Sequence, residues 1–116
     1  MLNLENKHRL MDMVSLLKAL SNERRVVIMC ALHKGEKSVG ELEQIIGISQ
    51  SALSQHLARL RKEGYVETRR DAQTIYYSLC NDMATKAFEQ LCQLYGVTEN
   101  GFSVNLEDGD MQEVAE

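Results

Sequence analysis

The sequence predicts a mainly α-helical domain that carries one small β-hairpin. Three observations indicate this class: apolar residues recur at three- and four-residue spacing along most of the chain, β-branched and aromatic residues gather between residues 65 and 79, and there is no proline to break a helix. A length of 116 residues and a mass of 13.2 kDa suit one compact domain. These dimensions exclude an enzyme built from several domains.

Two amphipathic helices are expected at the start of the chain. The first spans about residues 8–20. Its apolar residues recur at helical spacing: Leu10, Met13, Val14, Leu17 and Leu20. Ser21 and Asn22 interrupt this pattern, and either can cap the next helix. That second helix is apolar on most sides and ends near Lys34 and Gly35, so we expect it to lie at the centre of the domain.

A short helix, a tight turn and a longer helix follow. Ser38 and Glu41 match the capping-box pattern, in which each side chain satisfies a backbone amide at the start of a helix. The short helix stops at Gly47, which can adopt a left-handed conformation. Ser49 is placed to cap the longer helix, which runs through about Glu63. This order is the signature of a helix-turn-helix.

The pattern then changes from helix to strand. Residues 65–69 and 74–79 are rich in β-branched and aromatic side chains, and the polar residues 70–73 separate them, so we expect a hairpin. A last amphipathic helix, capped by Asn81 or Asp82, follows the hairpin. Four helices, a two-stranded wing and a fifth helix, in this order, predict a winged helix-turn-helix.

The distribution of charge indicates that the chain has two parts. The formal net charge is -4, but six of the 17 acidic residues lie in residues 97–116, which contain no Lys or Arg. The remaining residues, 1–96, hold 13 basic and 11 acidic residues, a net charge of +2. We therefore expect one folded domain over residues 1–96 and an acidic, flexible tail over residues 97–116.

The longer helix of the predicted helix-turn-helix has two contrasting sides. At about 100° per residue, the leucines at positions 53, 57 and 60 fall in one sector, which must face the core. The opposite side carries mainly small and amide residues: Ser51, Ser54, Gln55, Ala58 and Lys62. Glutamine can pair with the adenine edge in the major groove, and serine or alanine allows close approach. A helix side that only faced water would be richer in Lys and Glu, so this side predicts contact with double-stranded DNA.

Cationic and polar residues flank this side of the helix. Arg59 lies toward the helix end, while Arg69, Arg70 and Gln73 lie on the hairpin, where a wing would meet phosphates or the minor groove. His56 projects toward the flank of the leucine sector, and we interpret it as a packed or phosphate-bonding residue rather than a metal ligand. These positions extend the predicted DNA-binding surface to both sides of the helix.

Motifs of catalysis and targeting are not found in the sequence. It has no HExxH, P-loop or GxGxxG motif and no Ser or Cys in a recognisable nucleophile setting, so we expect neither an enzyme nor a cofactor. The three cysteines form no CxxC or CxC pair, which argues against a disulfide framework and a thiolate metal site. No apolar run approaches the ~18 residues of a membrane span, and residues 1–10 lack the features of a secretory signal. We expect a cytoplasmic protein that does not enter a membrane.

The first and last helices carry apolar stripes that one short domain cannot bury entirely. An identical subunit would cover them, so we expect a homodimer joined by these two helices. A two-fold dimer places two recognition helices about one duplex turn apart, which predicts an inverted-repeat operator.

Four segments resemble the ArsR/SmtB family of winged-helix regulators, in the branch that contains NolR and HlyU. They are LKALSNERR (17–25), SVGEL (38–42), SQSALSQHL (49–57) and TRRDAQTIYY (68–77), in the family's order and spacing. The resemblance covers about residues 8–96. It implies a homodimer through the first and last helices, sequence-specific binding to promoter DNA and, in most members, repression. By position, it assigns contacts with bases or phosphates to Gln50, Ser51, Ser54, Gln55, Arg69 and Arg70.

The resemblance also sets expectations about a signal. The family's metal sensors carry a CxC motif on the short helix, or Asp and His ligands on the last helix, and this sequence has neither set, so we expect no metal. A second branch senses sulfide or oxidants through two cysteines on the second and last helices. Cys30 occupies the first of these positions, but Gly96 occupies the second, and Cys92 lies one helical turn earlier.

Two alternatives to a plain dimeric regulator stay open. The first is a redox- or persulfide-responsive regulator of the same fold that uses Cys30 and Cys92. Cys92 is displaced by one helical turn, about 5.4 Å, and a disulfide needs Cα atoms within roughly 7 Å, so the last helix would have to shift in register for the two cysteines to bond. The favoured interpretation is that the cysteines act as small buried apolar residues. The second is a winged helix that binds a protein through its polar face and uses the acidic tail as a lure. The basic hairpin argues against this second alternative.

Overall fold

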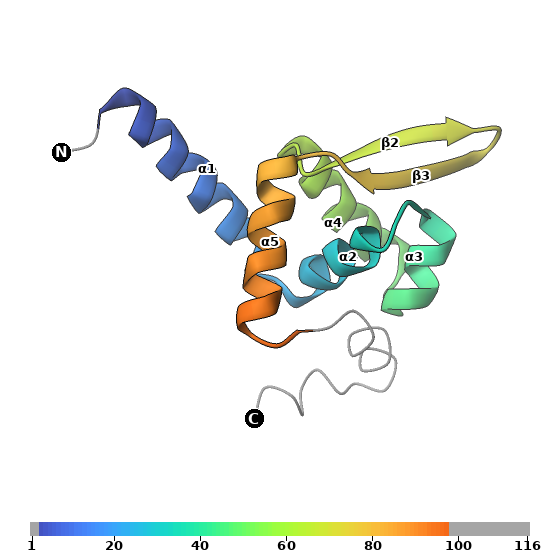
Figure 1. The fold of residues 1–116 in the computed structure, drawn as a ribbon. Coiled ribbons are helices and arrows are strands. Elements are labelled where there is room, and N and C mark those ends of the chain that lie inside the picture. Colours follow the sequence, from blue (N-terminus) through green and yellow to red (C-terminus); the bar gives the residue numbers. More distant parts are fainter. Residues whose placement is uncertain (1–2, 98–116) are drawn as a thin grey trace.

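The computed structural model describes residues 3–97, in which the chain forms five helices and three strands (Figure 1). In chain order they are α1 (Leu4–Leu20), α2 (Glu23–His33), β1 (Lys37–Ser38), α3 (Val39–Ile46), α4 (Gln50–Lys62), β2 (Val66–Asp71), β3 (Thr74–Leu79) and α5 (Asp82–Leu94). This order confirms the predicted winged helix-turn-helix. The expected acidic tail lies outside the described residues from residue 98 onward.

Side-chain caps define most of the helix starts that the sequence predicts. The side chain of Asn22 caps α2, and the side chain of Asn81 caps α5. Ser38 and Glu41 form the complete capping box of α3, and Ser49 caps α4. Each of these side chains satisfies a backbone group that has no partner within its own helix, so the predicted boundaries hold to within one or two residues.

α1 begins earlier than the apolar pattern indicates. Asn3 accepts a hydrogen bond from the backbone amide of Asn6 at 2.8 Å, so the helix starts at Leu4 and not near His8. All residues from 3 to 14 are exposed, and Leu16 and Ala19 near the helix end are the buried ones. The first half of α1 therefore extends away from the rest of the domain (Figure 1).

The sheet contains one strand that the sequence does not indicate. Its order is β1-β3-β2, with all pairs antiparallel. β1 pairs Lys37 with Tyr77 and Ser38 with Tyr76. A strand of two residues is too short to show a periodicity, which is why sequence patterns miss it. Because Ser38 also caps α3, this pairing ties the hairpin to the start of the helix-turn-helix.

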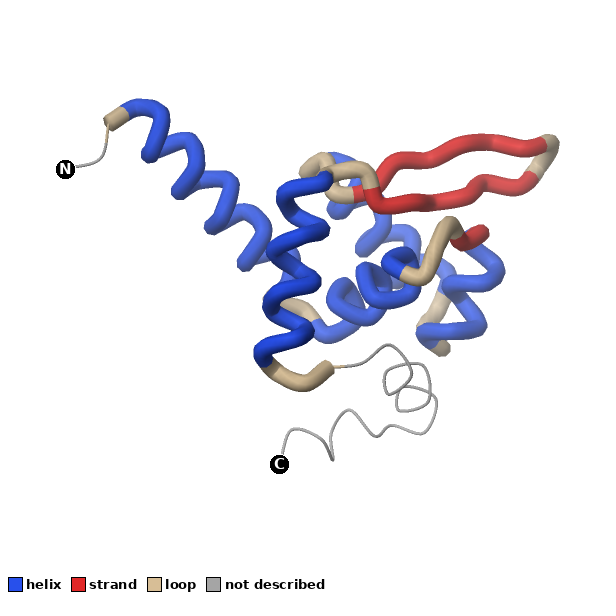
Figure 2. Tube along the Cα trace, viewed as in Figure 1, coloured by secondary structure: helices blue, strands red, loops and turns tan. Residues whose placement is uncertain are grey.

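The hairpin is longer, and its turn tighter, than expected. β2 and β3 pair along their whole lengths, so the turn consists of Ala72 and Gln73 alone rather than residues 70–73. Ala72 adopts a φ of 56°, the left-handed conformation that two-residue hairpin turns favour. Glycine or asparagine usually marks such a turn, and an alanine at this position carries no signal. The hairpin extends beyond the helices as a two-stranded wing (Figure 2).

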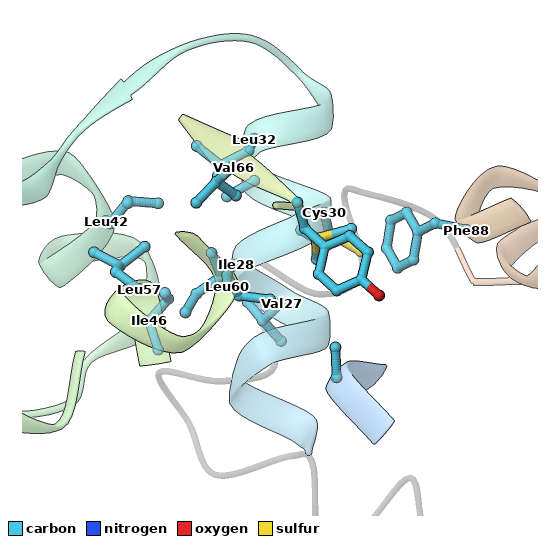
Figure 3. Close-up of a cluster of buried hydrophobic side chains, with 14 of the residues drawn as sticks. Val27, Ile28, Cys30, Leu32, Leu42, Ile46, Leu57, Leu60, Val66 and Phe88 are labelled. Atoms are coloured by element: carbon cyan, nitrogen blue, oxygen red, sulfur yellow. The ribbon is translucent and has the colours of Figure 1, made fainter. Parts of the chain in front are cut away.

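The core surrounds α2, as the sequence predicts. Seven of the eleven α2 residues are buried, and Ile28 is 0% exposed. Side chains from α3, α4, β2 and α5 pack around α2 (Figure 3). The contributors from these elements include Leu42, Ile46, Leu57, Leu60, Val66 and Phe88. Within residues 3–97, no helix combines the length and apolar character that a membrane crossing requires.

Candidate nucleic-acid interface

The junction of α3 and α4 fixes the orientation of the recognition helix, α4. α3 ends at Gly47, whose φ of 73° lies in the left-handed region that favours glycine. The Ser49 hydroxyl then accepts a hydrogen bond from the backbone amide of Ala52 at 3.2 Å, which begins α4 in a new direction. Three leucines of α4 are at most 1% exposed: Leu53, Leu57 and Leu60. These leucines therefore determine which side of α4 faces the core.

The outward side of α4 carries the four residues that the sequence assigns to DNA recognition. Gln50, Ser51, Ser54 and Gln55 are all exposed. The Ser51 hydroxyl lies 3.4 Å from that of Ser49, and the other three side chains make no hydrogen bond within residues 3–97. One side of α4 thus exposes amide and hydroxyl groups, which can form hydrogen bonds with the edges of DNA bases.

His56 lies on the flank of α4, between its buried and outward sides, and is half-buried. Burial lowers the pKa of His56 below its usual value of 6.5, and the charges of Arg25 and Arg24 lower it further. The imidazole is therefore mainly neutral at neutral pH. This environment fits a packed residue, while the bond to a phosphate stays a prediction.

Arg25, near the start of α2, joins this helix to α1, and its charge acts on His56. The buried Arg25 donates from Nε to the carbonyl oxygen of Ala19 at 2.7 Å and from Nη2 to that of Lys18 at 3.1 Å. Burial and then the charge of Arg59 lower the pKa of Arg25, whereas Glu63 raises it. These hydrogen bonds satisfy carbonyl groups at the end of α1, so the end of α1 is anchored to the start of α2.

Arg59 lies one turn before the end of α4 and is exposed. Its Nε is 3.6 Å from Oε2 of Glu63, four residues further along the helix. A single contact of this length stabilises a helix only slightly, and the Arg59 side chain is 45% exposed. Arg59 can therefore exchange the carboxylate for a phosphate at little cost.

The wing places its two arginines in different surroundings. Arg69 donates from Nε and Nη2 to the two carboxylate oxygens of Glu36, each at 2.8 Å, and its guanidinium lies 4.5 Å from the ring centroid of Tyr76. These hydrogen bonds are the first cause of the raised pKa of Arg69. Arg70 and Gln73 are exposed at the outer end of the hairpin. Sequence patterns miss Glu36 and Tyr76, because Glu36 lies 33 positions from Arg69 and belongs to no motif.

A cavity of about 320 Å³ lies between α2 and α5, away from the recognition helix. Cys30, Phe88 and Cys92 are among the residues that line it. At its edge, Nε2 of His33 lies 2.6 Å from a carboxylate oxygen of Glu89. The structure thus brings both cysteines that the sequence nominates to one cavity. Across residues 3–97, no cluster of three or more His, Cys, Asp or Glu side chains is arranged to hold a metal ion.

The helix-turn-helix, its exposed amide-bearing helix and the arginine-bearing hairpin define a winged helix-turn-helix protein. A model of the family described as "Bacterial regulatory protein, arsR family" matches residues 22–68. The transcriptional activator HlyU of Vibrio cholerae is 52% identical over 82 residues, which cover 71% of this chain and 76% of HlyU. The chain therefore belongs to the arsR family, and it is a DNA-binding transcriptional regulator.

Solved structures agree with this assignment. The crystal structure of NolR from Sinorhizobium fredii matches with a TM-score of 0.73 and 43% identity, covering 84% of this chain and 98% of that one. A homodimeric winged helix-turn-helix DNA-binding domain from Mycobacterium bovis, in solution, matches with a TM-score of 0.72 and 25% identity, covering 82% of this chain and 88% of that one. The similarity to HlyU and NolR confirms the branch that the sequence motifs indicate.

Proposed function

We propose that this chain is a homodimeric repressor that binds an inverted-repeat operator through α4 and the wing. The observation that carries the proposal is the outward side of α4, where exposed serine and glutamine side chains are backed by three fully buried leucines. Residues 1–96 then supply both DNA binding and dimerisation. Bound across a promoter, such a dimer occupies the duplex that the polymerase must enter.

Exposed apolar residues on the terminal helices support the dimer. On α1, Leu10, Met13 and Leu17 are 40%, 53% and 49% exposed, and at the end of α5, Leu94 and Tyr95 are 79% and 80% exposed. Burying apolar surface is favourable by roughly 25 cal/mol per Å². A second copy presents the same residues, so a two-fold contact would cover both sets at once. The homodimeric relative from Mycobacterium bovis supports this arrangement.

In the proposed complex, different residues of each subunit contact the bases and the sugar-phosphate backbone of the DNA. Gln50, Ser51, Ser54 and Gln55 read base edges or contact adjacent phosphates in the major groove. The flanking backbone is held by Arg59, Arg70 and Gln73, with His56 at the edge of the contact. Because the two subunits are related by a two-fold axis, their half-sites run in opposite directions.

Selection of bound duplexes from a random-sequence pool tests this proposal directly. The expected result is an enriched inverted repeat with half-site centres about 10.5 base pairs apart or a multiple of that distance. Sedimentation should give a dimer at the concentrations used. A stable monomer that enriches no sequence would overturn the proposal.

The salt dependence of operator binding offers a matched test of the wing. Replacing Arg70 with Gln should reduce the slope of log K against log salt concentration by about 0.9 per subunit, because one phosphate contact is lost. Lys86→Gln, which removes the same charge from an exposed position of α5, should leave the slope unchanged. Equal slopes in both variants would remove Arg70 from the proposed contact.

The cavity between α2 and α5 supports a second candidate function, a redox-responsive form of the same regulator. We propose that Cys30 and Cys92 form a disulfide on oxidation: the two thiols lose two protons and two electrons, and one molecule of hydrogen peroxide takes these up and is reduced to two water molecules. The new bond would join α2 to α5 and so couple the dimer contact to the core. Both cysteines line one cavity, which is the observation in its favour.

Operator affinity measured before and after peroxide treatment tests the redox candidate. The wild-type chain should change affinity, and Cys92→Ser should not respond. Cys80→Ser is the matched control, because Cys80 is exposed beside β3 and away from the cavity. Identical affinities of oxidised and reduced wild-type protein would reject the redox candidate and leave the DNA-binding proposal intact.

A further inference from the structure

The two neighbouring arginines of the wing point to opposite faces of the hairpin. Successive side chains of a strand alternate between faces, so Arg70 shares a face with the buried Val66, whereas Arg69 shares a face with the exposed Glu67. Arg69 lies directly opposite Tyr76 on β3, and Arg70 lies opposite Ile75. The two cations therefore cannot make equivalent contacts with one DNA backbone.

Glu36 occupies the hydrogen-bonding edge of Arg69. Nε and Nη2 of the guanidinium each donate to one carboxylate oxygen at 2.8 Å, a bidentate arrangement, while the ring of Tyr76 covers one guanidinium face at 4.5 Å. The backbone holds these partners in place, because Glu36 directly precedes β1 and Ser38 of β1 pairs with Tyr76. Arg69 is thus held between a carboxylate and an aromatic ring.

We propose that Glu36 is a specificity-determining residue that withholds Arg69 from the phosphates of DNA. This inference rests on the proposed DNA-binding function. A phosphate would need the same pair of donors that the carboxylate of Glu36 already takes, and the carboxylate also cancels the charge of Arg69. Arg70 is then the effective cation of β2. Phosphate contacts carry no sequence information, so withholding one lowers affinity for random DNA and leaves discrimination to α4.

Glu36→Gln tests this inference, with Glu67→Gln as the matched control. Both variants remove one negative charge. Glu67 is exposed on the face of β2 that carries Arg69, but unlike Glu36 it forms no ion pair within the described residues. The probe is a random-sequence duplex of about three helical turns, long enough for both subunits. Glu36→Gln should steepen the slope of log K against log salt concentration by about 0.9 per subunit and tighten binding several-fold at about 0.1 M salt. Glu67→Gln should keep the wild-type slope.

Arginine variants identify the cation that Glu36 withholds. Arg69→Gln alone should lower the slope less than Arg70→Gln does, because Arg69 makes no phosphate contact and only the freed carboxylate of Glu36 then opposes binding. In the double variant Glu36→Gln/Arg69→Gln, the gain from the first substitution should disappear. Circular dichroism melts of each variant verify that it folds.

Two outcomes would overturn the role of Glu36 and spare the proposed function: Glu36→Gln binds no more tightly than Glu67→Gln, or Arg69→Gln lowers the slope as much as Arg70→Gln. In both cases the wild-type chain still binds DNA. A wild-type chain that binds neither the random duplex nor a duplex selected from a random pool would refute both proposals together.

Discussion

α1 and α4 are both amphipathic helices, but they expose opposite kinds of side chain. α4 buries Leu53, Leu57 and Leu60 to within 1% of complete burial and presents amides and hydroxyls outward. α1 leaves apolar residues such as Met13 and Leu17 about half exposed, and its first half lies beyond the body of the domain (Figure 1). The two helices therefore suit different partners. The polar, hydrogen-bonding side of α4 suits DNA, whereas the apolar side of α1 suits another protein surface.

The contrast at α1 is tested by Leu17→Glu, for which we expect the largest effect. A carboxylate in the proposed dimer contact would be buried without a partner, so the protein should sediment as a monomer. Loss of the second half-site contact should weaken operator binding about a hundredfold or more. His8→Glu is the control, because it lies nine positions away and about 180° around the helix. Dimers of unchanged stability in Leu17→Glu would place the interface elsewhere.

The support beneath α4 is tested by Leu57→Ala. Leu57 is 1% exposed, and truncating a buried leucine costs about 2–5 kcal/mol of folding free energy through lost burial and the cavity left behind. Urea unfolding followed by circular dichroism measures this loss. Leu4→Ala, which truncates a leucine that is 69% exposed at the start of α1 and not among the residues proposed for the dimer contact, should change the unfolding free energy far less. Similar losses at both positions would contradict the contrast between the two helices.

The outward side of α4 is tested by Gln55→Ala. A lost bidentate contact to a base should reduce discrimination between operator and scrambled duplex by about 1–3 kcal/mol. The unfolding free energy should stay near that of the wild type, since the side chain is exposed. Gln90→Ala, at an exposed position of α5, serves as the control. An unchanged ratio of operator to scrambled affinity would remove Gln55 from base reading.

Features with a local chemical signal could be predicted from the sequence, and features made by distant residues could not. The capping box of α3 and the buried leucines of α4 follow from spacing alone, and the structure confirms both. The bidentate pair of Glu36 and Arg69 joins residues 33 positions apart, and only the sheet register brings them together. The hairpin turn is predicted at residues 70–73, but its two-residue form is not, since alanine adopts the left-handed φ at position 72 under the constraint of the paired strands.

His56 lies on the flank of α4 near Arg24 and Arg25 of α2, and the pH dependence that it adds to stability should be the smallest of these effects. The folded state lowers the pKa of His56, first by burial and then through Arg25 and Arg24. On acidification the unfolded chain takes up this proton first, near the usual value of 6.5, so the free energy of unfolding falls as pH drops through that range. His56→Gln removes this contribution.

Urea midpoints between about pH 7.5 and pH 5.5 should therefore decline less steeply in His56→Gln than in the wild type. His8→Gln is the control, because His8 lies on the exposed half of α1, and its midpoints should follow the wild-type slope. A His56→Gln curve parallel to that of the wild type would show that the folded state does not disfavour the charged imidazole. The flank would then tolerate positive charge beside Arg25, which would favour a phosphate-binding role for His56 over a packing role.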